Sequence, residues 1–238
     1  MTTATKTFKR NNGRKVDETR EIRAEVGIIP NADGSALFAF GDTIAIATVH
    51  GPRTMHPQHK QDPKKGVLRC NYDMLSFSVT ERKKPGPNRR SQEISKVTEW
   101  ALAQAVDLDD FPATVVDVNI IILQANASTR CAGINAASLA LAHAGVPMKE
   151  LVASVSIGKI DKTLVADVDK EEEDNEEGDG ATDIAMSFLC NSEKISHIQL
   201  DGKITAKELD EAIELGWKTC QKIKKIQEDT LKKVGEEK

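Results

Sequence analysis

The sequence predicts an α+β fold in which mixed and antiparallel sheets are covered by helices. Several short segments alternate apolar and polar residues, which is the pattern of half-buried strands, and turn residues join some of them directly. Two longer segments instead carry apolar residues three and four positions apart, which is typical of helices. The 238 residues are 39% hydrophobic and 4% aromatic, so we expect a core made mainly of aliphatic side chains and alanine.

The first half of the chain is predicted to contain five strands and one helix. Alternating segments predict strands at residues 21–30, 35–40, 43–50 and 66–79. Gly41 and Asp42 separate the second of these from the third and predict a hairpin. Residues 92–106 have the helical period. Residues 115–123 are almost continuously apolar, which predicts a strand covered on both faces.

The second half is predicted to contain two helices and four strands. A helix rich in small residues is expected at 130–143, because Gly145 and Pro147 follow it as helix-ending residues. Strands are expected at 151–160, 163–168, 183–190 and 195–200, and a long helix at 205–233. Residues 1–10 are expected to be a flexible segment. Residues 11–238 are expected to be one domain with an acidic loop at 169–182.

Composition excludes several classes of protein. No apolar run reaches the ~20 residues that cross a bilayer, and nothing resembles a signal peptide, so we expect a cytoplasmic protein with no membrane partner. The four cysteines form no C-x-x-C pair and indicate neither a zinc site nor a disulfide framework. The net charge of −4 argues against a uniformly basic surface for nucleic acid.

The charges are nevertheless concentrated in two segments. Residues 81–90, "ERKKPGPNRR", hold five cations in ten positions, and residues 169–183 hold nine carboxylates in fifteen. The basic segment leads into the helix expected at 92–106, so Arg89 and Arg90 at its entrance could grip a polyanion. A solvated loop is the alternative interpretation.

The junction between the strand at 115–123 and the next helix is a candidate anion site. Small residues lead into the helix, whose first N–H groups lie at the positive end of the helix dipole. Arg130 adds a guanidinium that matches phosphate oxygens, and Thr129 adds a hydroxyl. The alternative is a structural N-cap, supplied by Ser128 or Thr129, beside a surface arginine.

Asp183 lies where the acidic segment passes into a strand, so its carboxylate is expected to be held by a rigid element. A pair of carboxylates across such a loop can bind Mg²⁺ or donate a proton to a leaving oxygen. The alternative is a flexible solvated loop. A phosphate site, a polyanion clamp and a carboxylate pair are together the parts needed for phosphoryl transfer on a nucleic acid.

Several motifs in this order resemble one known family. They are "GRKVDETREI", "NADGSALFAFGDTIAIATVHGPRTMHP", "RRSQEISK", "TRCAGINAASLALAHAGVPM" and "GKIDKTLVADV", and the likeness extends over about residues 10–230. The sequence resembles the RNase PH family, most closely the catalytic RNase PH-like subunit of the archaeal exosome. The resemblance implies an RNase PH-like fold and phosphate-dependent 3′-to-5′ degradation of RNA to nucleoside diphosphates, with RNA tail addition as the reverse reaction.

The resemblance also implies partners and site residues. It implies single-stranded RNA, a hexameric ring shared with a non-catalytic paralogue, and RNA-binding cap subunits. By matching position, Arg130 and the residues Ala127, Ser128 and Thr129 would hold the attacking inorganic phosphate, which Arg90 would also reach. The family usually has Asp followed by Gly-Gly or Ala-Gly before this Ser/Thr-Arg pair. This chain has Asn126-Ala127-Ser128, which narrows the conformations open to the loop.

For RNA binding, Arg89 and Arg90 match the arginines that grip the 3′ end. A family arginine at the pore of the ring corresponds to Gln58 here, so Lys60 is expected to compensate for weaker threading of RNA.

For catalysis, Asp183 matches the second of two family acidic residues, and Asp174 is our choice for the first, with Asp179 or Glu177 as alternatives. The two are expected to act in catalysis and to bind Mg²⁺.

Two other functions remain open at this stage. One is a non-catalytic, RNA-binding ring or scaffold subunit of an exosome, which the altered loop at 126–128 favours. The other is a homohexameric RNase PH that trims tRNA 3′ ends. Arg130, Arg90 and Asp183 favour a catalytic chain over the scaffold.

Overall fold

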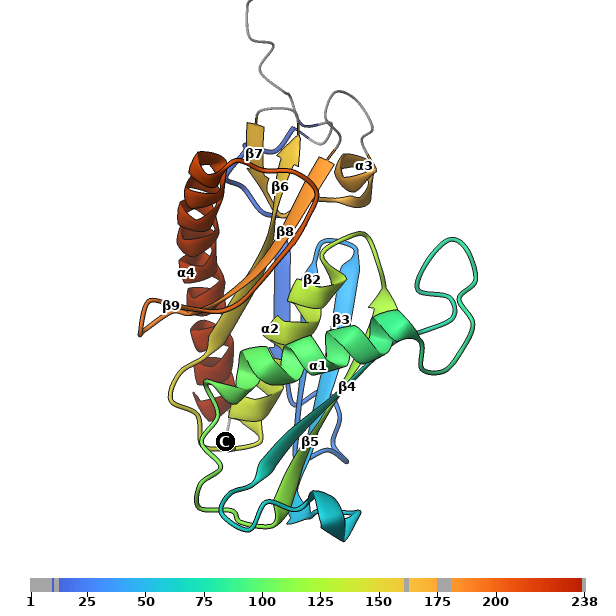
Figure 1. Cartoon of the computed structure of the whole chain (residues 1–238), viewed down its shortest axis with the longest axis vertical. Helices are drawn as coiled ribbons and strands as arrows, with labels where there is room; N and C mark the ends of the chain where they lie inside the picture. The colour runs from blue at the N-terminus through green and yellow to red at the C-terminus, as the bar shows by residue number, and fades with distance from the viewer. Residues whose placement is uncertain (1–9, 11–12, 161–162, 175–180, 237–238) are drawn as a thin grey trace, which may run out of the picture.

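The structure, a computed structural model, describes residues 10, 13–160, 163–174 and 181–236. Nine strands in these residues form two sheets (Figure 1). The strands are β1 (Ile22–Val26), β2 (Gly34–Phe40), β3 (Thr43–Thr54), β4 (Val67–Met74), β5 (Thr114–Gln124), β6 (Val152–Ile160), β7 (Thr163–Ala166), β8 (Ala181–Leu189) and β9 (Lys194–Asp201). The helices are α1 (Arg89–Ala103), α2 (Thr129–His143), α3 (Lys170–Glu173) and α4 (Ala206–Glu236), with a short 3-10 segment η1 (Gln58–Lys60).

The two sheets have the mixed and antiparallel pairing that the sequence predicts. The first has the order β1-β2-β3-β5-β4, in which only β4 and β5 run parallel. The second has the order β7-β6-β8-β9 and is antiparallel throughout. The predicted hairpin is confirmed, because Phe40 pairs with Thr43 and Gly41 between them has φ +52°.

Helix α2 lies between the two sheets and packs on β2, β3 and β6 (Figure 1). Its small residues permit close approach, since a Cβ on Gly34 of β2 would lie 2.4 Å from the carbonyl oxygen of Ala140. Helix α4 packs on β6 and β8, and α1 packs on β4 and reaches β9. One cluster of buried apolar side chains consequently extends through both sheets.

Strand β5 is covered on one face rather than on both, so that prediction is wrong. Burial alternates along the strand, and its open face carries Asp117, Asn119 and Ile121, the last of them 40% exposed. The β-branched Ile121 lies on the open face and makes the segment almost uniformly apolar. The composition of the segment therefore did not distinguish the two faces.

Helix α1 and the acidic segment also differ from the sequence prediction. Helix α1 begins at Arg89, earlier than expected, because Asn88 and Ser91 form a capping box at its start. The acidic segment is not all loop, since it contains α3, which Asp169 and Glu172 cap in the same way.

Arg10 is the one residue of the segment 1–10 that the structure describes. Arg10 is 2% exposed and forms an ion pair with Glu172, contrary to the expectation of a flexible segment up to residue 10. The rest of that segment, the turn at 161–162 and residues 175–180 of the acidic loop lie outside the described residues. Within the described part of the chain, no helix is long and apolar enough to span a membrane.

Candidate active site

A cavity of about 550 Å³ opens where the end of β5 and the start of α2 meet β6, β8 and α3. Residues of both sheets therefore contribute to its walls. The lining residues are Met74, Val79, Thr80, Glu81, Lys83, Arg90, Ala125, Ala127, Ser128, Thr129, Arg130, Cys131, Ser156, Lys170, Glu173, Asp183 and Ala185.

The loop before α2 adopts an unusual backbone conformation. Ala127 has φ +54° and Ser128 has φ +53°, so two consecutive residues other than glycine are left-handed. This conformation costs about 1–2 kcal/mol per residue for an L-amino acid. The missing glycine was expected to restrict the conformations open to this loop. Contacts elsewhere in the fold must therefore offset the energetic cost of the left-handed conformation.

The side chain of Ser128 does not cap α2, so a cap by Ser128 is wrong. Ser128 occupies the N-cap position without a side-chain cap bond. Its hydroxyl instead lies 3.1 Å from the carbonyl oxygen of Val168 and 3.3 Å from Asp167 Oδ1. The N–H groups of the first turn are left without this cap at the cavity wall, where the helix dipole favours an anion.

Arg130 is held at the cavity by two other elements. It donates hydrogen bonds to Gln199 of β9 and, at 3.4 Å, to Glu93 of α1. Its side chain is 18% exposed, and its buried Nε has no hydrogen-bond partner among the described residues. An arginine with a free donor beside an uncapped helix start fits an oxyanion better than the alternative of a surface arginine.

Asp183 and Glu173 supply two carboxylates to the cavity. Burial raises the pKa of Asp183, against the hydrogen bond that Ser156 donates to it and the charge of Arg130. Burial also raises the pKa of Glu173, and the nearby charge of Asp183 raises it further, while Lys170 lowers it. A carboxyl group with a raised pKa can carry the proton that a general acid donates.

Asp174, the sequence choice for the first acidic residue, does not line this cavity. It ends α3 with its side chain 61% exposed and lies 2.5 Å from Lys170 Nζ. The preceding residue, Glu173, lies at the cavity instead, because consecutive helical residues point about 100° apart. The alternatives Glu177 and Asp179 lie outside the described residues.

The predicted cations divide into two groups. Arg90 and Arg130 line the cavity, whereas Arg89 at the start of α1 and Lys60 in η1 are exposed and do not. Two lysines that were not singled out from the sequence, Lys83 and Lys170, also line the cavity. Lys170 is the one cation within the acidic segment, and this position in the sequence could have identified it.

The carboxylates suit a metal that shares its ligands with a substrate. The described residues contain no group of three or more His, Cys, Asp or Glu side chains that could hold a metal ion by themselves. Mg²⁺ is usually bound by one or two carboxylates together with substrate phosphates and water. Asp183 and Glu173 fit that pattern.

Comparison with known proteins identifies the family. The model of the 3′ exoribonuclease family, domain 1, matches residues 18–147, and that of domain 2 matches residues 150–219. The chain belongs to the 3′ exoribonuclease family, RNase PH. The family and fold predicted from the motifs are therefore confirmed. The cavity lies at the junction of the two family domains, because Arg130 is in the first and Asp183 in the second.

Relatives in this RNase PH family are similar over nearly the whole chain. The exosome complex component Rrp41 of Thermococcus gammatolerans is 48% identical over 226 residues, which cover 93% of this chain and 89% of that protein. Rrp41 of Nitrosopumilus maritimus is 45% identical and covers 94% of this chain and 90% of that protein.

Solved structures share the fold. Rice Rrp46 has a TM-score of 0.81 at 22% identity and covers 93% of this chain and 100% of that chain. A chain of the Archaeoglobus fulgidus exosome with RNA bound to the active site has a TM-score of 0.77 at 23% identity and covers 91% of this chain and 92% of that chain.

Proposed function

We propose that this chain is the catalytic ring subunit of an exosome and degrades RNA from its 3′ end with inorganic phosphate, releasing nucleoside diphosphates. One observation carries the proposal. The uncapped start of α2 and the free donor of Arg130 lie at the same cavity as the carboxyl group of Asp183, whose pKa burial raises. A site for an anionic nucleophile and a site for a proton donor are thus adjacent.

The residues divide the reaction between them. Arg130 and the backbone of Ala127, Ser128 and Thr129 bind the attacking phosphate, with Arg90 on the same cavity. A phosphate oxygen forms a bond to the last phosphorus of the RNA, and the bond from that phosphorus to the 3′ oxygen of the preceding nucleotide breaks. Asp183 delivers the proton to this 3′ oxygen. The nucleophile is a substrate, so no covalent enzyme intermediate forms, and excess nucleoside diphosphate reverses the reaction and extends the RNA.

Glu173, and Asp183 once it has given up its proton, are the residues that would hold Mg²⁺ at this cavity. When bound there, the ion would supply positive charge against the phosphate oxygens of the substrates. Asp174 was our choice from the sequence for the first acidic residue, but its place outside the cavity makes Glu173 the better candidate ligand.

RNA binding extends beyond the cavity. Arg90 is placed to contact the last phosphates, and Arg89, exposed at the start of α1, to contact the chain upstream. Lys60 in η1 is exposed and does not line the cavity, so it would contact the RNA upstream of its 3′ end.

The relatives support assembly into an exosome rather than a homohexameric RNase PH, because they are named exosome components. The proposal therefore includes a hexameric ring with a non-catalytic paralogue, RNA-binding cap subunits and a place in the cytoplasm.

The test is an assay of the assembled complex on single-stranded RNA, with and without phosphate. Wild type should release nucleoside diphosphates only with phosphate, and Asp183→Asn should lower kcat roughly 10²- to 10⁴-fold, the usual contribution of a general acid. Asp210→Asn, an exposed carboxylate of α4, is the control and should match wild type. RNA binding without diphosphate release would instead support the scaffold function, and release that Asp183→Asn leaves unchanged would refute the assigned role.

A further inference from the structure

The loop at 126–128 requires an explanation, because nothing in its own sequence favours two left-handed residues. Neither Ala127 nor Ser128 is a residue type that adopts φ near +54° readily. Such a conformation persists only where the surrounding structure holds it in place. The contacts of this loop therefore show which residues hold it.

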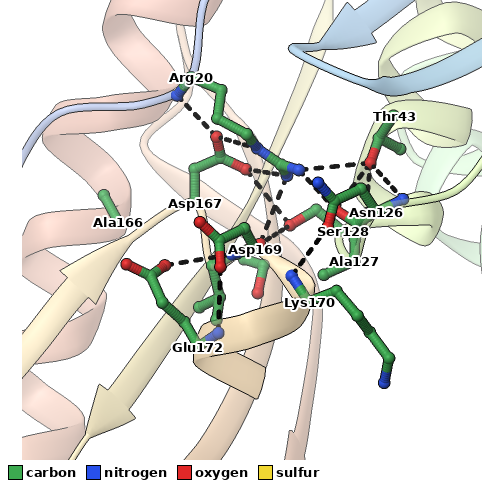
Figure 2. A network of polar contacts seen from close by, with 12 residues as sticks. Arg20, Thr43, Asn126, Ala127, Ser128, Ala166, Asp167, Asp169, Lys170 and Glu172 are labelled. Atoms are coloured by element: carbon green, nitrogen blue, oxygen red, sulfur yellow. Dashed lines mark hydrogen bonds and ion pairs between the residues drawn. The ribbon is translucent and has the colours of Figure 1, made fainter. Parts of the chain in front are cut away.

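Thr43, at the start of β3, binds the loop through its hydroxyl. The hydroxyl oxygen accepts the N–H of Asn126 at 2.9 Å and lies 2.8 Å from the carbonyl oxygens of both Asn126 and Ala127 (Figure 2). Thr43 is fully buried. One short side chain thus fixes the peptide groups on both sides of the first left-handed residue.

Arg20 and Asp167 bind the loop from the other side. The Arg20 guanidinium pairs with both carboxylate oxygens of Asp167, at 2.9 and 2.6 Å, and also donates to the carbonyl oxygen of Asn126 (Figure 2). Asp167 is fully buried and accepts the backbone N–H of Arg20 at 2.7 Å. Its Oδ1 is also near the hydroxyl of Ser128. This pair joins the first family domain to the second directly beside the loop.

Asn126 connects the same loop to α3. Its side-chain oxygen accepts the backbone N–H of Lys170 at 2.9 Å (Figure 2). The asparagine at this position therefore ties the loop to the helix that carries Glu173.

Resting on the proposed function, we propose that Thr43, Arg20 and Asp167 are positioning residues that hold the loop at 126–128 in the conformation that binds phosphate. None of the three lines the cavity, so they act through the loop and do not touch the substrates. Loss of one of them should weaken phosphate binding, while RNA, which is held mainly by other residues, should bind as before.

The first test compares Thr43→Val, which keeps the shape but removes the hydroxyl, with Thr43→Ser, which retains it. In the assembled complex, Thr43→Val should raise the KM for phosphate about tenfold or more, because it removes the hydroxyl that accepts the N–H of Asn126 and donates to a carbonyl oxygen of the loop. The KM for RNA should change less than about twofold. Thr43→Ser should stay close to wild type. Thr219→Val is the matched control, because the buried Thr219 hydroxyl donates within α4, to the carbonyl oxygen of Leu215, and has no other bond among the described residues.

A rescue experiment tests the conformational cause. Glycine adopts positive φ without the steric cost of a Cβ. Adding Ala127→Gly to Thr43→Val should therefore lower the KM for phosphate again. If Thr43→Val fails to fold, Arg20→Lys provides a second variant, since it keeps the positive charge but loses the bidentate pairing with Asp167.

Hydrogen exchange of the loop separates this inference from the proposed function. The backbone amides of residues 126–131 should exchange faster in Thr43→Val than in wild type or Thr219→Val, in the complex without substrates. Faster exchange in a complex whose wild type does not use phosphate would keep the positioning role and reject the function. Unchanged exchange and an unchanged KM for phosphate in both Thr43→Val and Arg20→Lys would overturn the inference, as would an equal rise in the KM for RNA.

Discussion

Two opposing effects set the protonation of Asp183, the residue assigned to protonate the leaving oxygen. Burial raises its pKa, while the hydroxyl of Ser156 donates a hydrogen bond that stabilises the charged carboxylate and lowers the pKa. Arg130 acts in the same direction as Ser156. The balance between the protonated and the charged form of Asp183 is therefore set by Ser156 and Arg130, which line the same cavity.

Ser156→Ala should move the alkaline limb of the kcat profile to higher pH. A general acid works in its protonated form, so activity falls as the pH rises through its pKa. Removing the hydrogen bond to the charged form raises that pKa, and the protonated form persists to higher pH. The measurement is kcat against pH at saturating RNA and phosphate. Ser154→Ala, which removes a buried hydroxyl that bonds the carbonyl oxygen of Met186, should leave the limb in place; a limb that moves to lower pH in Ser156→Ala would contradict the role of Asp183.

At this scale, a residue type near an element boundary was enough to point to the cavity. Arg130 and Asp183 were singled out because one lies in the first turn of a helix and the other near the start of a strand, and both line the cavity. Glu173 was missed because it is one of several adjacent carboxylates, and only the rotation of α3 determines which of them reaches the cavity. The pairing of Arg20 with Asp167 could not be predicted from the sequence for a related reason. It depends on a contact between residues 147 positions apart.

Among the elements, α1 connects the basic segment 81–90 to the cavity, because its first turn contains Arg89 and Arg90. Asn88 accepts the N–H of Ser91 at 2.9 Å and Ser91 accepts the N–H of Asn88 at 2.8 Å, so the helix has a fixed start. Arg89 and Arg90 are its first two residues. Their place at the start of the helix is therefore set by this capping box.

Asn88→Ala should therefore impair RNA binding together with stability. Loss of an N-cap side chain costs about 1 kcal/mol. That loss lowers the Tm by roughly 2–4 °C in a chain of this size. Fraying of the first turn should also raise the KM for RNA. Thr205→Ala provides the control, because Thr205 makes a similar exchange with Glu208 before α4, far from the basic segment. A control that raises the KM for RNA as much as Asn88→Ala would show that the effect is only a loss of stability.

The elements also show which sequence signals were sufficient. The hairpin at Gly41 and the helix of small residues before Gly145 were predictable, because turn and helix-ending residues act locally. The Asp169 and Glu172 capping box was equally local, but the surrounding carboxylates favoured a loop over the short α3. The open face of β5 was not predictable, because exposure of Ile121 depends on which elements pack on the sheet.

On the scale of the whole molecule, three arginines near the N-terminus bind residues in the second half of the chain. Arg10 binds both oxygens of Glu172, at 2.6 and 2.8 Å, and the carbonyl oxygen of Ala166, while Arg14 and Arg20 reach Asp167. These contacts join residues 147 to 162 positions apart. They involve Glu172 of α3 and Asp167 beside the loop at 126–128, and the loop and α3 both line the cavity.

Glu172→Gln should lower the stability of the entire chain. The side chains of Arg10 and Glu172 are 1% and 3% exposed, so removing the carboxylate leaves a buried guanidinium without its counter-charge. Such a change costs about 3–5 kcal/mol. For a chain of this length it corresponds to a fall in Tm of roughly 6–20 °C, measured by thermal unfolding of the assembled complex.

The matched control is Glu211→Gln on α4, whose pair with Lys207 is largely exposed and should contribute less than about 1 kcal/mol. The double variant Arg10→Met with Glu172→Met separates the two possible causes of a loss. If the cost arises from an uncompensated buried charge, two apolar side chains should recover most of the Tm, because buried ion pairs are often replaceable by apolar residues of similar volume. A double variant as unstable as Glu172→Gln would instead show that the other contacts of these two side chains matter, namely the bonds from Arg10 to the carbonyl oxygens of Ala166 and Asp167 and the capping of α3 by Glu172.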